Sequence, residues 1–182
     1  MKKVNLLLGV FLLFSTALLA QTTFTLSSKD MGGQTTKLQE FNGFGCSGDN
    51  ISPQLFWKNA PKETKSFAIT MYDPDAPTGS GFWHWVLFDI PVTASEIVSN
   101  AGNASLNLLP KGTIQSITDY GIKGFGGPCP PPNHGYHQYI ITIYALKTEK
   151  LGLDANTSPA IVGFNLWANT IEKASIVAYY KR

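Results

Sequence analysis

Two separated segments of the sequence contain side chains that could do chemistry. The first, DPDAPTGSGFWHW, carries Asp73, Asp75 and His84, and the second, GIKGFGGPCPPPNHGYH, ends on His137. All three histidines of the chain lie in or directly beside these segments. Two imidazoles and two carboxylates support three kinds of chemistry: oxyanion binding, metal binding and hydrolytic catalysis.

Oxyanion binding uses all of these groups. Each imidazole would donate an N–H to a phosphate-like oxygen, while a carboxylate holds the other ring nitrogen and favours the charged ring. The backbone of residues 126–128 (Gly-Gly-Pro) would complete the pocket, because glycine permits close approach and proline keeps the wall rigid. Structural roles compete with this reading: Asp before Pro commonly holds a turn, and a lone histidine in a strand is commonly a hydrogen-bonded core residue.

Metal binding and hydrolysis have weaker support. The sequence has no H-E-x-x-H motif and no G-x-S-x-G nucleophile elbow. Cys129 stands near His134 and His137 and could pair with one of them as a thiolate, but a disulfide or a proline-locked loop is the simpler role. We therefore expect no catalytic residue, no metal site and no cofactor.

Apolar runs predict the strands that position these groups. The segments SFAITMYD, FWHWVLFDI and YIITIYAL are nearly continuously apolar over residues 67–72, 82–90 and 139–146, which is typical of central strands covered on both faces. Further strands are expected at TFTLSS (23–28) and at the C-terminal ASIVAYY. Period-two alternation would place His84 on the opposite face from Trp83 and Trp85.

One helix is expected from about Pro159 to Lys173, with Thr157 or Ser158 as its N-cap. A second short helix around residues 93–98 would follow from a threonine and a glutamate at capping-box spacing. The pattern as a whole predicts a mostly β domain of two packed sheets, a β-sandwich with one or two short peripheral helices. The stripe expected to pack on the sheet consists of Ile161, Phe164, Ala168 and Ile171.

The N-terminal segment MKKVNLLLGVFLLFSTALLA reads as a secretory signal peptide over residues 1–20, cleaved near Ala20. Its apolar run is short for a bilayer span of about 20 residues, although an uncleaved membrane anchor is the alternative. We expect a secreted or periplasmic single domain over residues 21–182, without a transmembrane anchor after cleavage. Without Lys2 and Lys3 the chain has 12 basic residues (14 minus 2) against 12 acidic ones, which argues against nucleic acid as a partner.

Cys46 and Cys129 are the two cysteines of the chain. An even number in an oxidising compartment makes a disulfide plausible, and two buried free thiols are the alternative.

Several of these segments together resemble a known family. DPDAP (73–77), WHW (83–85), GFGGPCPPP (124–132), HQY (137–139) and FGCSGDNISPQLFW (44–57) are similar to motifs of the phosphatidylethanolamine-binding protein family, in its bacterial, Raf-kinase-inhibitor-like branch. The resemblance extends from about Thr23 to the C-terminus. It implies a β-sandwich with a small preformed pocket that binds phosphate, phosphate esters or phospholipid headgroups.

The resemblance also implies a set of ligand-binding positions. His134 falls in a variable part of the loop and is not carried over. Gln138 stands where relatives commonly have arginine, and the chain stops soon after AYYKR, so we expect a more open pocket without that ion pair. The alternative function is a protein-interaction or protease- or kinase-inhibitor-like module that uses the same pocket; a weak hydrolase or metal-dependent enzyme is less favoured. The matching positions are Asp73, Asp75, His84, Gly127, Pro131, His137 and Tyr139.

Overall fold

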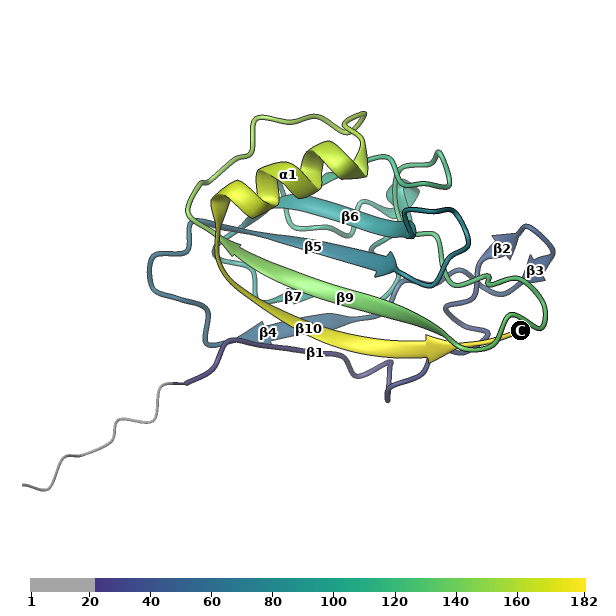
Figure 1. Ribbon diagram of the computed structural model, residues 1–182. Coiled ribbons are helices and arrows are strands. Elements are labelled where there is room, and N and C mark those ends of the chain that lie inside the picture. Colours follow the sequence, from purple (N-terminus) through teal and green to yellow (C-terminus); the bar gives the residue numbers. More distant parts are fainter. Residues whose placement is uncertain (1–21) are drawn as a thin grey trace, which may run out of the picture.

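The computed structural model describes residues 22–182, which form a sandwich of two antiparallel sheets with a helix on the outer face of the larger one (Figure 1). The larger sheet contains, in spatial order, β10 (Thr170–Tyr180), β9 (His137–Leu146), β5 (Ser66–Asp73), β6 (Phe82–Pro91) and β8 (Ile114–Gln115). The smaller sheet contains β1 (Thr25–Ser27), β4 (Leu55–Lys58) and β7 (Glu96–Ile97). A separate hairpin pairs β2 (Asn42–Gly43) with β3 (Cys46–Ser47). The predicted fold class is confirmed.

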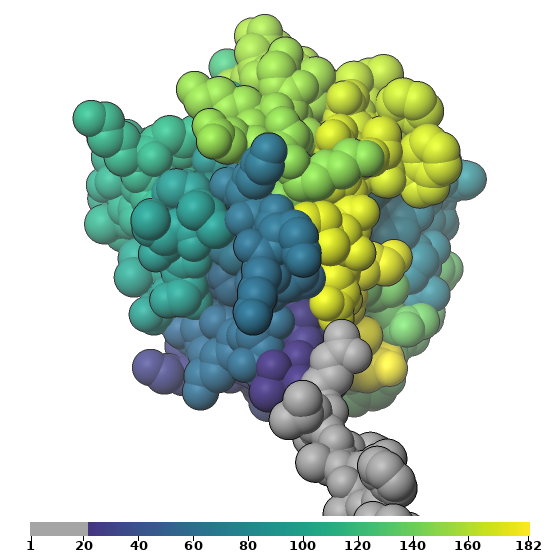
Figure 2. Space-filling model, turned by 90° about the vertical axis from the view of Figure 1, so that its left-hand side faces the viewer, coloured from purple at the N-terminus to yellow at the C-terminus, as the bar shows by residue number. Residues whose placement is uncertain are grey.

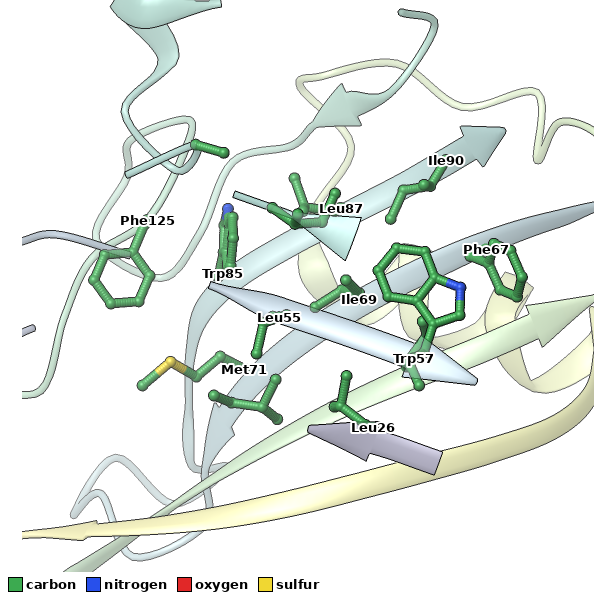
Figure 3. Packing of buried hydrophobic residues seen from close by; sticks show 14 of the residues in the cluster. Leu26, Leu55, Trp57, Phe67, Ile69, Met71, Trp85, Leu87, Ile90 and Phe125 are labelled. Atoms are coloured by element: carbon green, nitrogen blue, oxygen red, sulfur yellow. The ribbon is translucent and has the colours of Figure 1, made fainter. Parts of the chain in front are cut away.

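The main core lies between the two sheets (Figure 3). The smaller sheet contributes Leu26, Leu55 and Trp57, which are almost fully buried. The larger sheet contributes alternate side chains of β5, β6 and β9, such as Ile69 and Leu87. Because β5, β6 and β9 are also covered on their other face, their sequences are continuously apolar, as expected of central strands.

The helix α1 (Pro159–Asn169) covers the outer face of the larger sheet. It packs through Pro159, Val162 and Leu166, whereas Ile161 is 52% exposed and Phe164 is 65% exposed. The predicted stripe was therefore wrong: Ala168 is exposed too, and Ile171 belongs to β10. The helix ends four residues before the predicted Lys173 because the chain enters β10 directly at Thr170.

Figure 2 shows the end of the molecule far from β2 and β3, with light green and yellow C-terminal residues above and beside the blue segment near residue 60.

The predicted short helix at residues 93–98 was also wrong. The segment makes a turn and then the strand β7, because Glu96 and Ile97 pair with β4. Ile97 is buried in the main core, so tertiary packing overrides the capping-box signal. A short 3₁₀ helix, Ala104–Leu106, follows instead, capped by the side chain of Asn103.

The predicted signal peptide lies outside the described residues. Within residues 22–182, no helix is long and apolar enough to cross a membrane.

Candidate functional site

Five of the seven predicted site residues line a cavity of about 160 Å³ at the end of the larger sheet where β5 ends and β6 and β9 begin. The loop between β5 and β6 forms one wall, and the Pro-rich segment before β9 forms another. The lining residues are Phe44, Asp73, Ala76, Pro77, Thr78, Phe82, His84, Tyr120, Cys129, Pro130, Pro131, His137 and Tyr139. The two segments singled out in the sequence thus meet in space.

His84 is turned into this cavity by a β-bulge. Trp83 pairs with Tyr72 and Trp85 pairs with Met71, so His84 has no partner across the strand pair. The extra residue interrupts the alternation. Trp83 packs on the helix side of the sheet, but Trp85 belongs to the main core, as does Tyr139, whose ring lies 5.1 Å from the His84 ring. The expectation that His84 would face away from both tryptophans was therefore wrong for Trp85.

The hydrogen bonds of His84 define its tautomer. Its Nδ1 lies 2.8 Å from the carbonyl oxygen of Gly126, and because a carbonyl can only accept, Nδ1 carries the hydrogen. The nitrogen left for the cavity is Nε2. Burial lowers the pKa of His84 below its usual range, although the Gly126 carbonyl and nearby Asp73 favour the charged ring. A backbone carbonyl, and not a carboxylate as predicted, holds the second nitrogen of this ring.

Asp73 orients the other predicted histidine. Its Oδ2 accepts a hydrogen bond from Nδ1 of the buried His137 at 2.7 Å. Nε2 of His137 lies 2.8 Å from Nδ1 of His134, whose side chain is exposed. The three side chains form a hydrogen-bonded chain from the buried carboxylate to the surface. Sequence reasoning set His134 aside, although its position three residues before His137 was a usable signal.

Asp75 has a different place from the one predicted. Its Oδ2 accepts a hydrogen bond from the backbone N–H of Gln138 at 2.8 Å, and its own N–H donates to Oδ1 of Asp73. Asp75 is not among the residues that line the cavity. It therefore ties the β5–β6 loop to the start of β9 and does not orient a histidine.

Gly127 also has a different place from the one predicted, because it packs closely against the backbone of Gln39. A Cβ at this position would come within 1.7 Å of the carbonyl oxygen of Gln39, so only glycine fits. Its N–H donates to Oδ1 of Asn50, and its carbonyl accepts from the hydroxyl of Tyr120. Gly127 is not a lining residue, whereas Pro131 is one.

Two tyrosines line the cavity, and their hydroxyls differ in hydrogen bonding. Tyr120, stacked on Phe41, donates its hydroxyl hydrogen to Gly127. The Tyr139 side chain is fully buried, and its hydroxyl has no hydrogen-bond partner in the structure. Burial raises the pKa of both hydroxyls well above the usual range, so both remain protonated at neutral pH. Tyr139, which lines the cavity, therefore keeps a hydroxyl hydrogen that no described acceptor takes. Tyr120, Phe44 and Phe82, which sequence reasoning did not single out, form the aromatic part of the wall.

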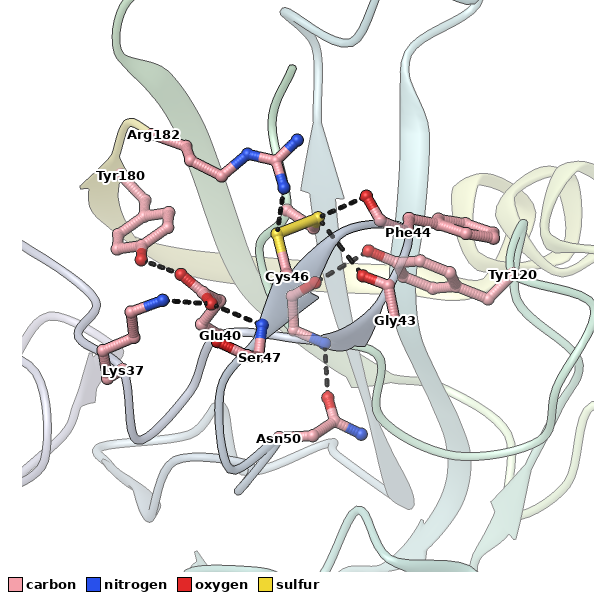
Figure 4. Close-up of a disulfide and its surroundings, with 12 residues drawn as sticks. Lys37, Glu40, Gly43, Phe44, Cys46, Ser47, Asn50, Tyr120, Tyr180 and Arg182 are labelled. Carbon is pink, nitrogen blue, oxygen red and sulfur yellow. Dashed lines mark hydrogen bonds and ion pairs between the residues drawn. A yellow bond between two sulfur atoms is a disulfide. The ribbon is translucent and has the colours of Figure 1, made fainter. Parts of the chain in front are cut away.

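A disulfide between Cys46 and Cys129 closes one side of the site (Figure 4). The predicted pairing is thus present, and Cys129 lines the cavity. Glu40 reinforces the same region: its buried carboxylate accepts hydrogen bonds from the Lys37 ammonium at 2.6 Å, the Ser47 N–H at 3.0 Å and the Tyr180 hydroxyl. Burial alone would raise the pKa of Glu40, but these hydrogen bonds outweigh it and the pKa is lowered. Burial and the Glu40 carboxylate raise the pKa of Tyr180 to about 12.

The geometry also bears on the metal and thiolate chemistries considered from the sequence. Within residues 22–182, no group of three or more His, Cys, Asp or Glu side chains is arranged to hold a metal ion. The cysteine that faces the cavity is disulfide-bonded, so the thiolate role considered for it does not apply.

Comparisons with known proteins agree with the fold and with these motifs. The family model for phosphatidylethanolamine-binding protein matches residues 28–181. The UPF0098 protein YbcL of Escherichia coli strain K12 is 44% identical over 179 residues, covering 97% of this chain and 98% of YbcL. A UPF0098 protein of Aquifex aeolicus is 38% identical over 177 residues, covering 94% of this chain and 95% of the relative. None of these names describes an enzymatic activity.

A solved structure gives the same result in three dimensions. The crystal structure of E. coli YbcL, described as a member of the mammalian PEBP family, superposes with a TM-score of 0.85 at 46% identity, covering 87% of this chain and 98% of that one. A PEBP homologue from Chlamydia trachomatis has the same fold at 23% identity, with a TM-score of 0.72 over 87% of this chain and 97% of its own. The chain belongs to the phosphatidylethanolamine-binding protein family.

Proposed function

We propose that this protein is a non-enzymatic binding protein that takes small anionic ligands, such as phosphate, a phosphate ester or a phospholipid headgroup, into the cavity at the end of the larger sheet. The observation that carries the proposal is the fully buried Tyr139 hydroxyl, a donor without a partner on a residue that lines the cavity beside His84. A buried polar group without a partner costs free energy, and a bound oxyanion would supply the missing acceptor.

The size and walls of the cavity support a small ligand. A volume of about 160 Å³ is below the several hundred Å³ typical of pockets for drug-sized molecules, so a single phosphate-sized group fits this site better than an acyl chain does. The prolines at 77, 130 and 131 and the disulfide at Cys129 keep the walls rigid, which limits the ordering cost of binding.

Titration calorimetry of the expected mature chain, residues 21–182, with phosphate, phosphoethanolamine and acetate at pH 6.5 tests the proposal. Saturable heat with at least one of these ligands is expected, and it should weaken in the variant Tyr139→Phe. Folded protein that gives no saturable heat with any of the three would contradict small-anion binding.

Export is a further part of the proposed function. Residues 1–20 have the sequence features of a cleaved signal peptide, and a disulfide between Cys46 and Cys129 suits an oxidising compartment. Cell fractionation with mass determination of the mature protein tests this. An intact N-terminus in protein recovered from the cytoplasm would contradict it.

One observation favours a second candidate function, the binding of a peptide terminus or an acidic side chain of a protein partner. Phe44 lines the cavity and is nevertheless 71% exposed, so one large aromatic side chain beside the cavity is open to contact with a partner chain. Pull-down from envelope extract with wild type and His84→Ala tests this alternative. A partner that depends on the cavity is lost with the variant, whereas equal capture by both proteins excludes the cavity as its binding site.

A further inference from the structure

The cavity presents more hydrogen-bond acceptors than donors. Nδ1 of His84 donates to the Gly126 carbonyl, so a neutral ring offers only the lone pair of Nε2. Asp73 brings a negative charge, and its two carboxylate oxygens accept hydrogen bonds from Nδ1 of His137 and from the N–H of Asp75. The hydroxyls of Thr78 and Tyr120 already donate to backbone carbonyls. Among the described residues that line the cavity, Tyr139 has the hydroxyl that still has its hydrogen to give.

Charged and titratable groups surround His84 from several elements. Asp73 at the end of β5 and Asp119 in the loop after β8 favour its protonation. Tyr120 and Tyr139 contact the ring edge-on and stay neutral. His137 lines the same cavity but is engaged by Asp73 and His134. Burial outweighs the two carboxylates and lowers the pKa of His84, so the ring is neutral in the free protein at neutral pH.

From this arrangement we propose that the cavity selects oxyanions that carry a proton: Nε2 of His84 accepts the hydrogen of a P–O–H group, and the Tyr139 hydroxyl donates to a second oxygen of the same ligand. The proposal rests on the proposed function and narrows it to phosphate and phosphate monoesters, because the phosphodiester of a phospholipid headgroup has no P–O–H group at neutral pH. Apart from the uptake of a proton, no covalent bond forms or breaks. An oxygen of an oxyanion without a hydrogen would be repelled by the His84 lone pair and by the Asp73 carboxylate. Such a ligand therefore binds only with uptake of one proton from solvent. This proton is held between Nε2 of His84 and the ligand oxygen.

Three simple probes separate these cases. Inorganic phosphate keeps a P–O–H group throughout the range from pH 6 to 9. Methyl phosphate, a monoester, loses its last such group with a second pKa of about 6. Sulfate has none in this range but has the same shape as phosphate. The probes therefore differ in the hydrogen they bring and little in size.

The expected affinities follow from the proton count. Between pH 7.5 and 8.5 the Kd of methyl phosphate should rise about tenfold, because one proton must be taken up. The Kd of phosphate should change by less than about threefold over the same range, since its hydrogen is already present. At pH 7.5 sulfate should bind at least about tenfold more weakly than phosphate, because it leaves a buried acceptor unpaired.

Calorimetry at constant ionic strength, in two buffers of different ionisation enthalpy, measures Kd and proton uptake together. Uptake near one proton for methyl phosphate at pH 8.5 and near zero for phosphate would support the proposal. A flat methyl phosphate profile without proton uptake, or sulfate binding as tightly as phosphate, would overturn it. Absence of binding by all three probes at pH 6.5 would instead refute the proposed function.

Two variants attribute the effect to a residue. His84→Gln replaces the titratable ring by an amide of similar reach, so the dependence of methyl phosphate binding on pH should disappear. Tyr139→Phe is the matched control: it should weaken phosphate and methyl phosphate alike and preserve the pH dependence. A full tenfold rise per pH unit in folded His84→Gln would contradict the assignment to His84. If that variant does not fold, the comparison of the three probes on the wild type still decides the proposal.

Discussion

Removal of the disulfide is the perturbation with the clearest consequence for both the fold and the cavity. In the double variant Cys46→Ala/Cys129→Ala, a cross-link over 83 residues of sequence separation is lost. The chain-entropy model gives a loss of about 4.5 kcal/mol in the free energy of unfolding for a loop of this size. The hydrogen bonds to Glu40 hold the same region in place, so the native state should still form.

The cavity should loosen together with the fold. Cys129 and Phe44 both line it, and the disulfide joins the segment of Cys129 to the β2–β3 hairpin beside Phe44. We expect the double variant to bind phosphate several-fold more weakly, because the wall must be ordered on binding.

Urea unfolding followed by tryptophan fluorescence measures the stability, and calorimetry measures the affinity. The matched control is the wild type with and without a thiol reductant: reduction should reproduce the double variant, and reductant should leave the double variant unchanged. A stability loss below about 1 kcal/mol, with an unaltered unfolding slope, would refute the cross-link reasoning. Unchanged phosphate affinity would refute the role of the disulfide in the wall.

Three further predictions concern single side chains. Tyr139→Phe should raise the free energy of unfolding by about 1 kcal/mol while it weakens phosphate binding, because it removes a buried hydroxyl without a partner; equal or lower stability in urea unfolding would contradict this. Glu40→Gln should cost about 2 kcal/mol at pH 6. Since the folded pKa of Glu40 is lowered, its contribution is present above the unfolded value and is lost as the pH falls through the folded one, so the difference between wild type and variant should shrink at pH 3; a constant difference would refute it. Leu166→Ala should destabilise the protein by about 2 to 4 kcal/mol and Trp167→Ala by less than about 0.5 kcal/mol, as measured by urea unfolding, because Leu166 is buried and Trp167 is 79% exposed; the reverse order would contradict the packing of α1.

The central strands could be predicted from sequence because each is a continuous apolar run that ends at polar or Gly- and Pro-rich turns. The face of α1 could not be predicted in the same way. Ile161, Val162, Phe164, Leu166 and Trp167 surround the helix with apolar side chains, so periodicity alone does not distinguish the buried stripe from the exposed one. The short strand β7 depends on pairing with β4, a long-range contact that leaves no local signal.

The candidate site was predictable in its polar members and less so in its geometry. Asp73, His84, His137 and Tyr139 meet at one cavity because β5, β6 and β9 are neighbours in the sheet. The bulge at His84 interrupts the alternation of side chains between the two faces of the sheet, and the pattern of apolar residues does not reveal it. The glycine at position 127 indicated that another group comes close to the backbone there, but that group is the backbone of Gln39 and not a ligand. Ligand binding by these residues stays a prediction.

The chain has three histidines, which makes its imidazole nitrogens a direct probe of the central claim. Nitrogen NMR of the histidine rings at pH 6.5, assigned with single-histidine variants, should show hydrogen on Nδ1 of His84 and a lone pair on Nε2 in the free protein. Addition of phosphate should shift the Nε2 signal of His84 saturably, by formation of a hydrogen bond at that atom. Unchanged signals from all three rings at saturating phosphate concentrations would contradict anion binding in this cavity.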